Sequence, residues 1–154
     1  MSDSLSLETR SPEETEALGA QLVKLLPESC VVALYGNLAA GKTCLVRGMT
    51  QSFVEDNTVI HSPTFTLVNQ YGDDPPFYHL DLYRLAGPEE LIELGYEELF
   101  DGAGICAVEW SERAEDWLPA TRISITLEHG GGDLRKISIQ NTGVLDSGWQ
   151  ERLI

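Results

Sequence analysis

A short loop rich in small residues constrains the fold of this chain more than any other feature. Residues 36–43 read Gly-Asn-Leu-Ala-Ala-Gly-Lys-Thr and fit the pattern G-x-x-x-x-G-K-S/T. An unbroken apolar run at 31–35 precedes the loop, as expected of a strand buried on both faces of a parallel sheet. Residues 42–53 then place apolar side chains at helical spacing. A strand, this loop and a helix, in that order, predict a P-loop domain.

The physical chemistry of such a loop favours phosphate. Its glycines let the backbone curl so that successive N–H groups point inward, and the following helix N-terminus adds partial positive charge. We expect Lys42 to reach the β- and γ-phosphates of ATP and the Thr43 hydroxyl to bind Mg²⁺. Without nucleotide, the Lys42 side chain is expected to face mostly solvent. The ATP-binding residues predicted in this region are Gly36, Asn37, Leu38, Ala39, Ala40, Gly41, Lys42, Thr43 and Cys44.

A P-loop also needs a carboxylate that helps to hold magnesium, usually at the end of a neighbouring apolar strand. Glu109 follows the apolar run at 105–108, at the edge where open α/β sheets bind their ligands. Asp81 lies in an alternating segment and shares a strand face with His79. The alternatives are a surface carboxylate near a helix start for Glu109, and an ion pair with Arg84 or a solvated position for Asp81.

The remaining segments predict the rest of the domain. Turn residues separate two pairs of alternating segments, 65–71 from 77–82 and 123–127 from 134–139, which indicates two antiparallel hairpins. Helices are expected from an N-cap at Ser11 to near Pro27, over 88–100 with a break at Gly95, from a cap at Ser111 to about residue 117, and over 144–153. We therefore expect one domain over residues 1–154: an α/β, P-loop NTPase-like fold with a central mixed, mostly parallel sheet flanked by helices.

The segment between the P-loop helix and the first hairpin resembles a phosphate-sensing switch in its position. Ser62 and Thr64 carry hydroxyls that could contact magnesium-bound water or the γ-phosphate, although a plain Ser-Pro turn is the alternative. The arginines that could stabilise transferred charge are Arg47, Arg84, Arg113 and Arg135, and the sequence does not choose among them. His79 and His129 have no partners at metal-ligand spacing and receive no catalytic role.

Charge limits the partners that this chain can bind directly. The net charge is −15, the isoelectric point is near 4.3, and only three lysines occur, so tight binding to RNA or DNA by the chain alone is disfavoured. An acidic field can steer a basic protein partner, or can simply keep a protein soluble. The chain has no apolar run of about 20 residues that could span a membrane, and three unpaired cysteines suit a reducing compartment, so we expect a cytoplasmic protein with reduced thiols.

Several motifs together resemble one family. Besides the loop, these are Ser-Pro-Thr-Phe-Thr-Leu-Val at 62–68, His-Leu-Asp-Leu-Tyr-Arg-Leu at 79–85 and Val-Glu-Trp at 108–110. Their order and spacing resemble the bacterial TsaE family over nearly the whole chain. That family is the ATPase component of the machinery that makes threonylcarbamoyladenosine in tRNA, and it works with the proteins TsaD and TsaB.

The resemblance implies a role for each matching residue. Lys42 would contact the phosphates, Thr43 and Glu109 would bind magnesium, and Asp81 would be an essential carboxylate near the γ-phosphate. It also implies that Ser62 and Thr64 form a switch, that Trp110 lies against the site, and that ATP and Mg²⁺ are bound; Arg135 is added to the ATP-binding residues. The expected catalytic residues are Lys42, Asp81 and Glu109.

The loop departs from the family pattern G-D-L-G-A-G-K-T at Asn37 and Ala39, and Cys44 replaces a threonine directly after it. Both anchoring glycines remain, so we expect nucleotide binding to persist. The resemblance further implies that ATP hydrolysis cycles the complex with TsaD and TsaB, and that tRNA is met only through that complex. A small-molecule P-loop kinase and a nucleotide-sensing module with little catalysis are the competing hypotheses.

Overall fold

The computed structural model describes residues 3–36, 41–51, 53, 68–72, 75–83 and 87–153. Six of the predicted site residues lie outside these ranges: Asn37, Leu38, Ala39, Ala40, Ser62 and Thr64. None of the described helices has the length and apolar character needed to cross a membrane.

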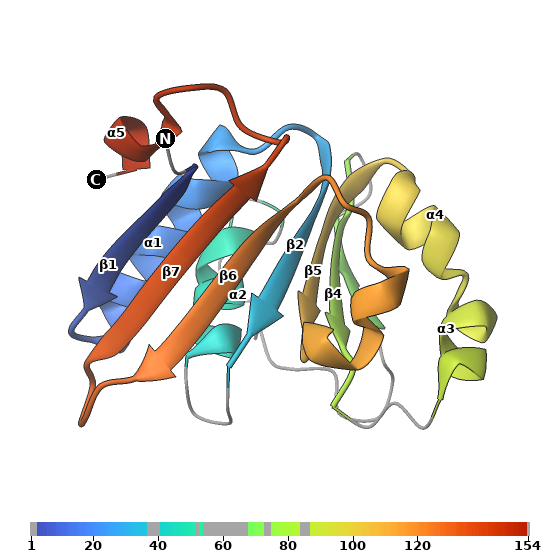
Figure 1. Cartoon of the computed structure of the whole chain (residues 1–154), viewed down its shortest axis with the longest axis horizontal. Coiled ribbons are helices and arrows are strands. Elements are labelled where there is room, and N and C mark those ends of the chain that lie inside the picture. The colour runs from blue at the N-terminus through green and yellow to red at the C-terminus, as the bar shows by residue number, and fades with distance from the viewer. Residues whose placement is uncertain are drawn as a thin grey trace.

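A seven-stranded mixed sheet forms the centre of the fold, with the order β1-β7-β6-β2-β5-β4-β3 (Figure 1). The middle strands β6, β2, β5 and β4 run parallel, whereas β1, β7 and β3 are antiparallel to their neighbours. This confirms the predicted fold class and both hairpins. The strands are β1 (Ser4–Thr9), β2 (Ser29–Tyr35), β3 (Val68–Tyr71), β4 (Phe77–Asp81), β5 (Gly104–Glu109), β6 (Arg122–His129) and β7 (Arg135–Thr142).

Helices cover the two faces of the sheet. The helices are α1 (Pro12–Leu25), α2 (Lys42–Thr50), α3 (Pro88–Leu94), α4 (Tyr96–Asp101), the 3₁₀ helix η1 (Ser111–Trp117) and α5 (Trp149–Leu153). Alternate residues of β2 enter two separate cores, because successive strand side chains point to opposite faces. Val32 and Leu34 pack with α1 and α2, while Val31 and Ala33 pack with α3, α4 and η1. All four side chains are at most 1% exposed, as the apolar run predicted.

Two glycines bring α1 and α2 into backbone contact. A Cβ added at Gly19 would lie 2.2 Å from the Leu45 carbonyl oxygen, and one at Gly48 would lie 1.9 Å from that of Glu16. Neither position can hold a larger residue unless the helices separate. This close packing fixes α2 against the first helix.

The chain ends differ from the sequence-based expectation. β1 was not predicted, and it pairs antiparallel with β7, about 130 residues away. The last helix covers only Trp149–Leu153, because the Asn141 side chain accepts hydrogen bonds from the amides of Val144 and Leu145 and holds that stretch in a turn. Asp3 joins both ends of the fold by accepting bonds from the Trp149 indole and the Asn141 amide, each 2.6 Å long.

Helix starts were predicted with mixed success. Ser11 caps α1 as expected, by accepting the Glu14 amide at 3.1 Å. Ser111 was expected to cap a helix but does not: it is fully buried, accepts the Leu34 amide and donates to the Val108 carbonyl. Its hydroxyl therefore ties β2 to β5. The N-cap position of η1 is held by Trp110, whose left-handed backbone (φ 60°) turns the chain sharply after β5.

Candidate functional site

The site lies where the carboxyl ends of the parallel strands meet one edge of the sheet, as is general for open α/β folds. Gly36 leaves β2 with φ 143°, and Gly41 begins α2 with φ 101°. Backbone in this region favours glycine, because a Cβ would clash with the chain's own carbonyl oxygens. The two glycines of the sequence motif therefore stand where the chain leaves the strand and enters the helix.

Lys42 lies in the first turn of α2 and folds back toward the start of the loop. Its ammonium donates to the Gly36 carbonyl at 2.5 Å and lies 3.6 Å from the centre of the Trp110 ring. Only 5% of Lys42 is exposed, so the expectation of a solvent-facing side chain was wrong. Burial lowers the pKa of Lys42, against the opposing effects of Glu109, Glu112 and Asp81. The sequence could not reveal this contact, since it depends on the backbone turn at Trp110.

Two carboxylates stand side by side next to this lysine. Asp81 and Glu109 end β4 and β5 and are direct partners in the parallel register, so their side chains share the sheet face that carries α2. The Thr43 hydroxyl lies 3.3 Å from each oxygen of Glu109. Glu109 is 3% exposed, which excludes the alternative of a surface carboxylate.

Asp81 is half-buried and its carboxylate accepts the Tyr83 amide at 3.0 Å. Burial is the main effect that raises its pKa, and Glu109 adds to it, while the Tyr83 amide, His79 and Lys42 oppose it. The alternative ion pair with Arg84 involves a residue outside the described ranges. A carboxylate whose pKa is raised next to a cation and a second carboxylate is typical of sites that move or hold protons.

His79 was given no role from the sequence, yet the structure places it in this cluster. The imidazole is fully buried, and its Nε2 lies 2.5 Å from Glu109 Oε2. His79 precedes Asp81 by two residues and so shares its strand face, which is the signal that could have found it.

The Trp110 ring contacts both the buried Lys42 and the exposed Tyr83. It stacks against the ring of Tyr83 with centroids 4.9 Å apart, and the Arg113 guanidinium lies 5.8 Å from the Tyr83 centroid. A tryptophan with positive φ is uncommon and costs about 1–2 kcal/mol of backbone strain. Such strain persists where the surrounding contacts require it, here beside Lys42.

Arg135 and Cys44 both lie near Gly41. They line a cavity of about 160 Å³ together with Pro12, Thr15, Gly41, Arg47 and Asp133. The Arg135 guanidinium donates to the carbonyls of Gly132 and Leu134, which holds it over the hairpin turn. The Cys44 thiol donates to the Pro12 carbonyl at 3.1 Å, and burial raises its pKa, so the structure favours a packed thiol over a reactive thiolate.

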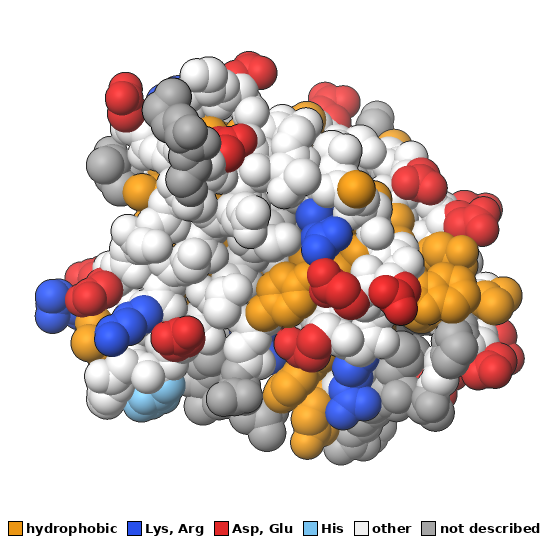
Figure 2. All heavy atoms as spheres, viewed as in Figure 1, with side chains coloured by type: hydrophobic (Ala, Val, Ile, Leu, Met, Phe, Trp, Pro, Cys, Tyr) orange, Lys and Arg blue, Asp and Glu red, His pale blue; other side chains and the backbone are white. Residues whose placement is uncertain are grey.

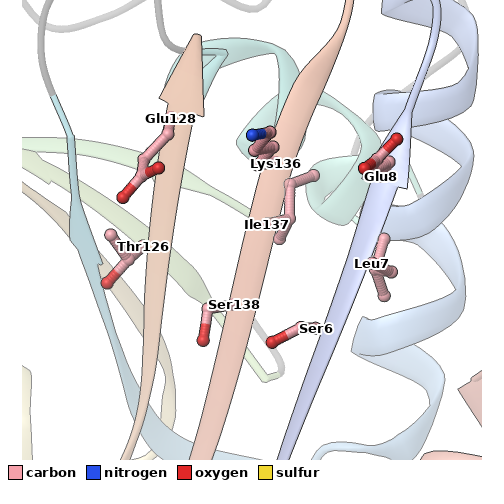
Figure 3. Close-up of a pocket in the computed structure, with 8 residues that line it drawn as sticks. All are labelled: Ser6, Leu7, Glu8, Thr126, Glu128, Lys136, Ile137 and Ser138. Atoms are coloured by element: carbon pink, nitrogen blue, oxygen red, sulfur yellow. The ribbon is translucent and has the colours of Figure 1, made fainter. Parts of the chain in front are cut away.

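A larger cavity, about 320 Å³, lies on β1, β7 and β6, and its polar side chains from β6 and β7 point to the face opposite α1 and α2 (Figure 3). Lys136 stands between Glu8 and Glu128 in the strand register, and hydroxyl side chains cover much of the rest. None of the predicted site residues lines it. We interpret it as the solvated polar face of an antiparallel sheet.

The donor set around Glu109 suits magnesium. A hydroxyl and a carboxylate offer hard oxygen ligands, and Mg²⁺ is usually bound by one or two such groups together with phosphate oxygens and water. No cluster of three or more His, Cys, Asp and Glu side chains in the described part of the chain could hold a metal ion. The Thr43 hydroxyl and the Glu109 carboxylate are oxygen ligands of the kind that Mg²⁺ prefers.

Comparisons with known proteins show which proteins this chain is similar to. The model of a family described as "Threonylcarbamoyl adenosine biosynthesis protein TsaE" matches residues 9–137, which include the loop and both carboxylates. A Bacillus subtilis protein described as "tRNA threonylcarbamoyladenosine biosynthesis protein TsaE" is 36% identical over 140 residues, which cover 90% of this chain and 87% of that protein. The Treponema pallidum protein of the same description is 39% identical over 132 residues, 85% of this chain and 96% of that protein. The crystal structure of Bacillus subtilis YdiB superimposes with a TM-score of 0.72 at 31% identity and covers 99% of this chain and 93% of that one.

Proposed function

The chain belongs to the TsaE family of threonylcarbamoyl adenosine biosynthesis proteins, and we propose that it binds and hydrolyses Mg-ATP to cycle a complex with TsaD and TsaB during tRNA modification. One observation carries the proposal: at the end of the P-loop, the Thr43 hydroxyl lies 3.3 Å from both oxygens of a buried Glu109. Lys42 and Asp81 stand beside this pair. A cation, a hydroxyl and two carboxylates at a helix N-terminus are the parts that nucleotide hydrolysis requires.

Each residue of the site has a separate task in this proposal. Lys42 exchanges the Gly36 carbonyl and the Trp110 ring for the β- and γ-phosphates of ATP. Thr43 and Glu109 hold magnesium, which would neutralise charge that develops on the phosphate oxygens. Asp81 orients the attacking water and accepts its proton as the bond from the γ-phosphorus to the bridging oxygen breaks, which yields ADP and phosphate. A raised pKa suits a carboxylate that accepts a proton near neutral pH.

The nucleotide is proposed to continue from the loop toward the cavity beside Gly41. Arg135 and Cys44 line that cavity and come from segments that are far apart in the sequence. Arg135 supplies a positive charge next to the point where phosphates bind, which supports its place among the ATP-binding residues. Ser62 and Thr64 are proposed to sense the γ-phosphate, in line with the switch-like position of their segment.

Charge supports a protein partner over direct contact with nucleic acid. Acidic side chains gather over α3, α4 and η1 (Figure 2). Residues 87–117 carry a single arginine, Arg113, against nine carboxylates outside the site: Glu89, Glu90, Glu93, Glu97, Glu98, Asp101, Glu112, Glu115 and Asp116. Such a surface repels a polyanion. We therefore propose that this cytoplasmic protein meets tRNA only through its complex with TsaD and TsaB.

The competing hypotheses differ in what happens to the γ-phosphate. A small-molecule kinase needs basic groups that cover the transferred phosphate, yet Arg47 and Arg122 are engaged in ion pairs with Glu16 and Glu115. A nucleotide-sensing module would bind ATP with little turnover. Phosphate release, measured with and without TsaD and TsaB, separates the three: we expect slow release that the partners accelerate.

A second measurement tests the cycle itself. Because a nucleotide shifts a partner equilibrium only through differential binding, the affinity for TsaD and TsaB should differ between the ATP and ADP states. Equal affinity in both states would argue against the proposed cycle, even if ATP is hydrolysed.

A further inference from the structure

His79 is fully buried at the candidate site, although the proposed chemistry gives it no task. The sheet register places His79 opposite Ala107 on β5. The next pair on the same face, two residues further along each strand, is Asp81 and Glu109. His79 is therefore a diagonal neighbour of Glu109 on the same face, within the reach of a long side chain. The small Ala107 side chain between them leaves room for the imidazole to approach the carboxylate.

The two ring nitrogens of His79 have different surroundings. Nε2 lies 2.5 Å from Glu109 Oε2. Nδ1 is buried and has no hydrogen-bond partner among the described residues. An ionised carboxylate can only accept, so Nε2 carries the proton and donates it. Nε2 is therefore the donor nitrogen in this contact.

This arrangement fixes one end of the Glu109 carboxylate. Oε2 is bonded to His79, while both oxygens face the Thr43 hydroxyl at 3.3 Å. A glutamate has three side-chain torsions, and a donor at one oxygen selects the orientation that faces the P-loop helix.

We propose that His79 is a positioning residue, which holds the Glu109 carboxylate toward Thr43 and thereby sets the affinity for magnesium in the nucleotide complex. The inference rests on the proposed function, since it takes Glu109 as a magnesium-binding group. Partners that orient metal-binding carboxylates contribute about 10- to 100-fold to metal affinity or activity in other proteins.

Three variants test the assignment. His79→Leu removes the N–H donor, His79→Gln keeps an N–H at a similar distance from the backbone, and Phe77→Leu is the matched control. Phe77 is fully buried on the same face of β4 and packs on Phe53, 5.3 Å between ring centroids. ATP affinity is titrated for each variant at a series of Mg²⁺ concentrations and without Mg²⁺.

We expect His79→Leu to lower the magnesium-dependent part of ATP affinity about tenfold or more and to leave magnesium-free affinity unchanged. His79→Gln should recover much of this loss, and Phe77→Leu should match the wild-type protein. A readout independent of nucleotide is long-range ¹H–¹⁵N NMR of the His79 ring in the nucleotide-free protein. It should show a proton on Nε2, the nitrogen that faces Glu109.

Two results would overturn the inference alone: wild-type magnesium dependence in His79→Leu, or a ring with no proton on Nε2. If His79→Leu does not fold, the ring protonation and the His79→Gln titration decide. If the wild-type protein itself shows no magnesium-dependent ATP binding, the proposed function fails and the inference falls with it. The wild-type titration thus distinguishes the two failures.

Discussion

Replacing Lys42 with methionine should affect stability and nucleotide binding very differently. The ammonium is 5% exposed, donates to the Gly36 carbonyl and lies over the Trp110 ring. A desolvated cation–π contact contributes about 2 kcal/mol, and a hydrogen bond from a charged donor contributes about 1.5–3 kcal/mol. Removing the ammonium from water costs several kcal/mol, which offsets most of both.

Methionine has a similar length and can stay against the Trp110 ring through a sulfur–aromatic contact worth about 0.3–1.5 kcal/mol. We therefore expect the free energy of unfolding of Lys42→Met to lie within about 1 kcal/mol of the wild-type value. This corresponds to a shift in melting temperature of no more than about 4 °C. Truncating one partner of a buried charge pair costs about 2–5 kcal/mol. ATP affinity should accordingly fall by a factor of about 30 to several thousand.

Isothermal titration with Mg-ATP and thermal unfolding test both halves of this prediction. Lys24→Met, the same change at an exposed position near the end of α1, is the control and should leave affinity and stability unaltered. If Lys42→Met binds ATP within about threefold of wild type, Lys42 does not contact the phosphates. A large loss of stability would instead contradict the balance between burial cost and contacts.

Further predictions concern the other site residues. Thr43→Ala and Glu109→Ala should each weaken the magnesium dependence of ATP binding, and the double variant should lose less than the sum, because both groups act on one ion; additive losses would separate their roles. Asp81→Asn should lower turnover far more than ATP affinity, as expected of an interaction made mainly in the transition state. A pre-steady-state assay measures the two separately, and a larger loss of affinity than of turnover would contradict this role. The raised pKa of Asp81 means that the folded protein binds its proton more tightly than the unfolded chain, so this group lowers stability as pH rises through the folded value. Asp81→Asn should therefore melt higher than wild type near neutral pH and lose that advantage in acid, and a melting temperature below wild type at neutral pH would refute the sign. Mg-ATP should change the fluorescence of Trp110, since Lys42 leaves its ring, and a Trp110→Phe variant that keeps the whole signal would place the change elsewhere.

The fold was predictable wherever local chemistry determines an element. The apolar run of β2 and the turn residues of two hairpins each act within about ten residues of sequence, and the buried strand and both hairpins are confirmed. The glycine loop stays a prediction, because residues 37–40 lie outside the described ranges. β1 was missed because it pairs with β7, which lies near the other end of the chain. Its short alternating segment is rich in serine, and only pairing with the distant β7 makes it a strand.

The site shows the same limit more sharply. Thr43, Asp81 and Glu109 were predicted from the motif and the strand ends, and the structure places them close to one another. His79 was not predicted, since its partner comes from β5 and is brought near by the parallel register. Lys42 was expected in solvent because no local pattern reveals that the left-handed turn at Trp110 places an aromatic ring under the ammonium.

Repeated tRNA modification is the most direct test of the central claim. In a reaction with tRNA, TsaD, TsaB, threonylcarbamoyl-adenylate and ATP, we expect several rounds of modification per TsaD only when this chain is present. Lys42→Met in its place should stop the reaction after about one round. Undiminished multiple-turnover modification when the chain is omitted would contradict the proposed function.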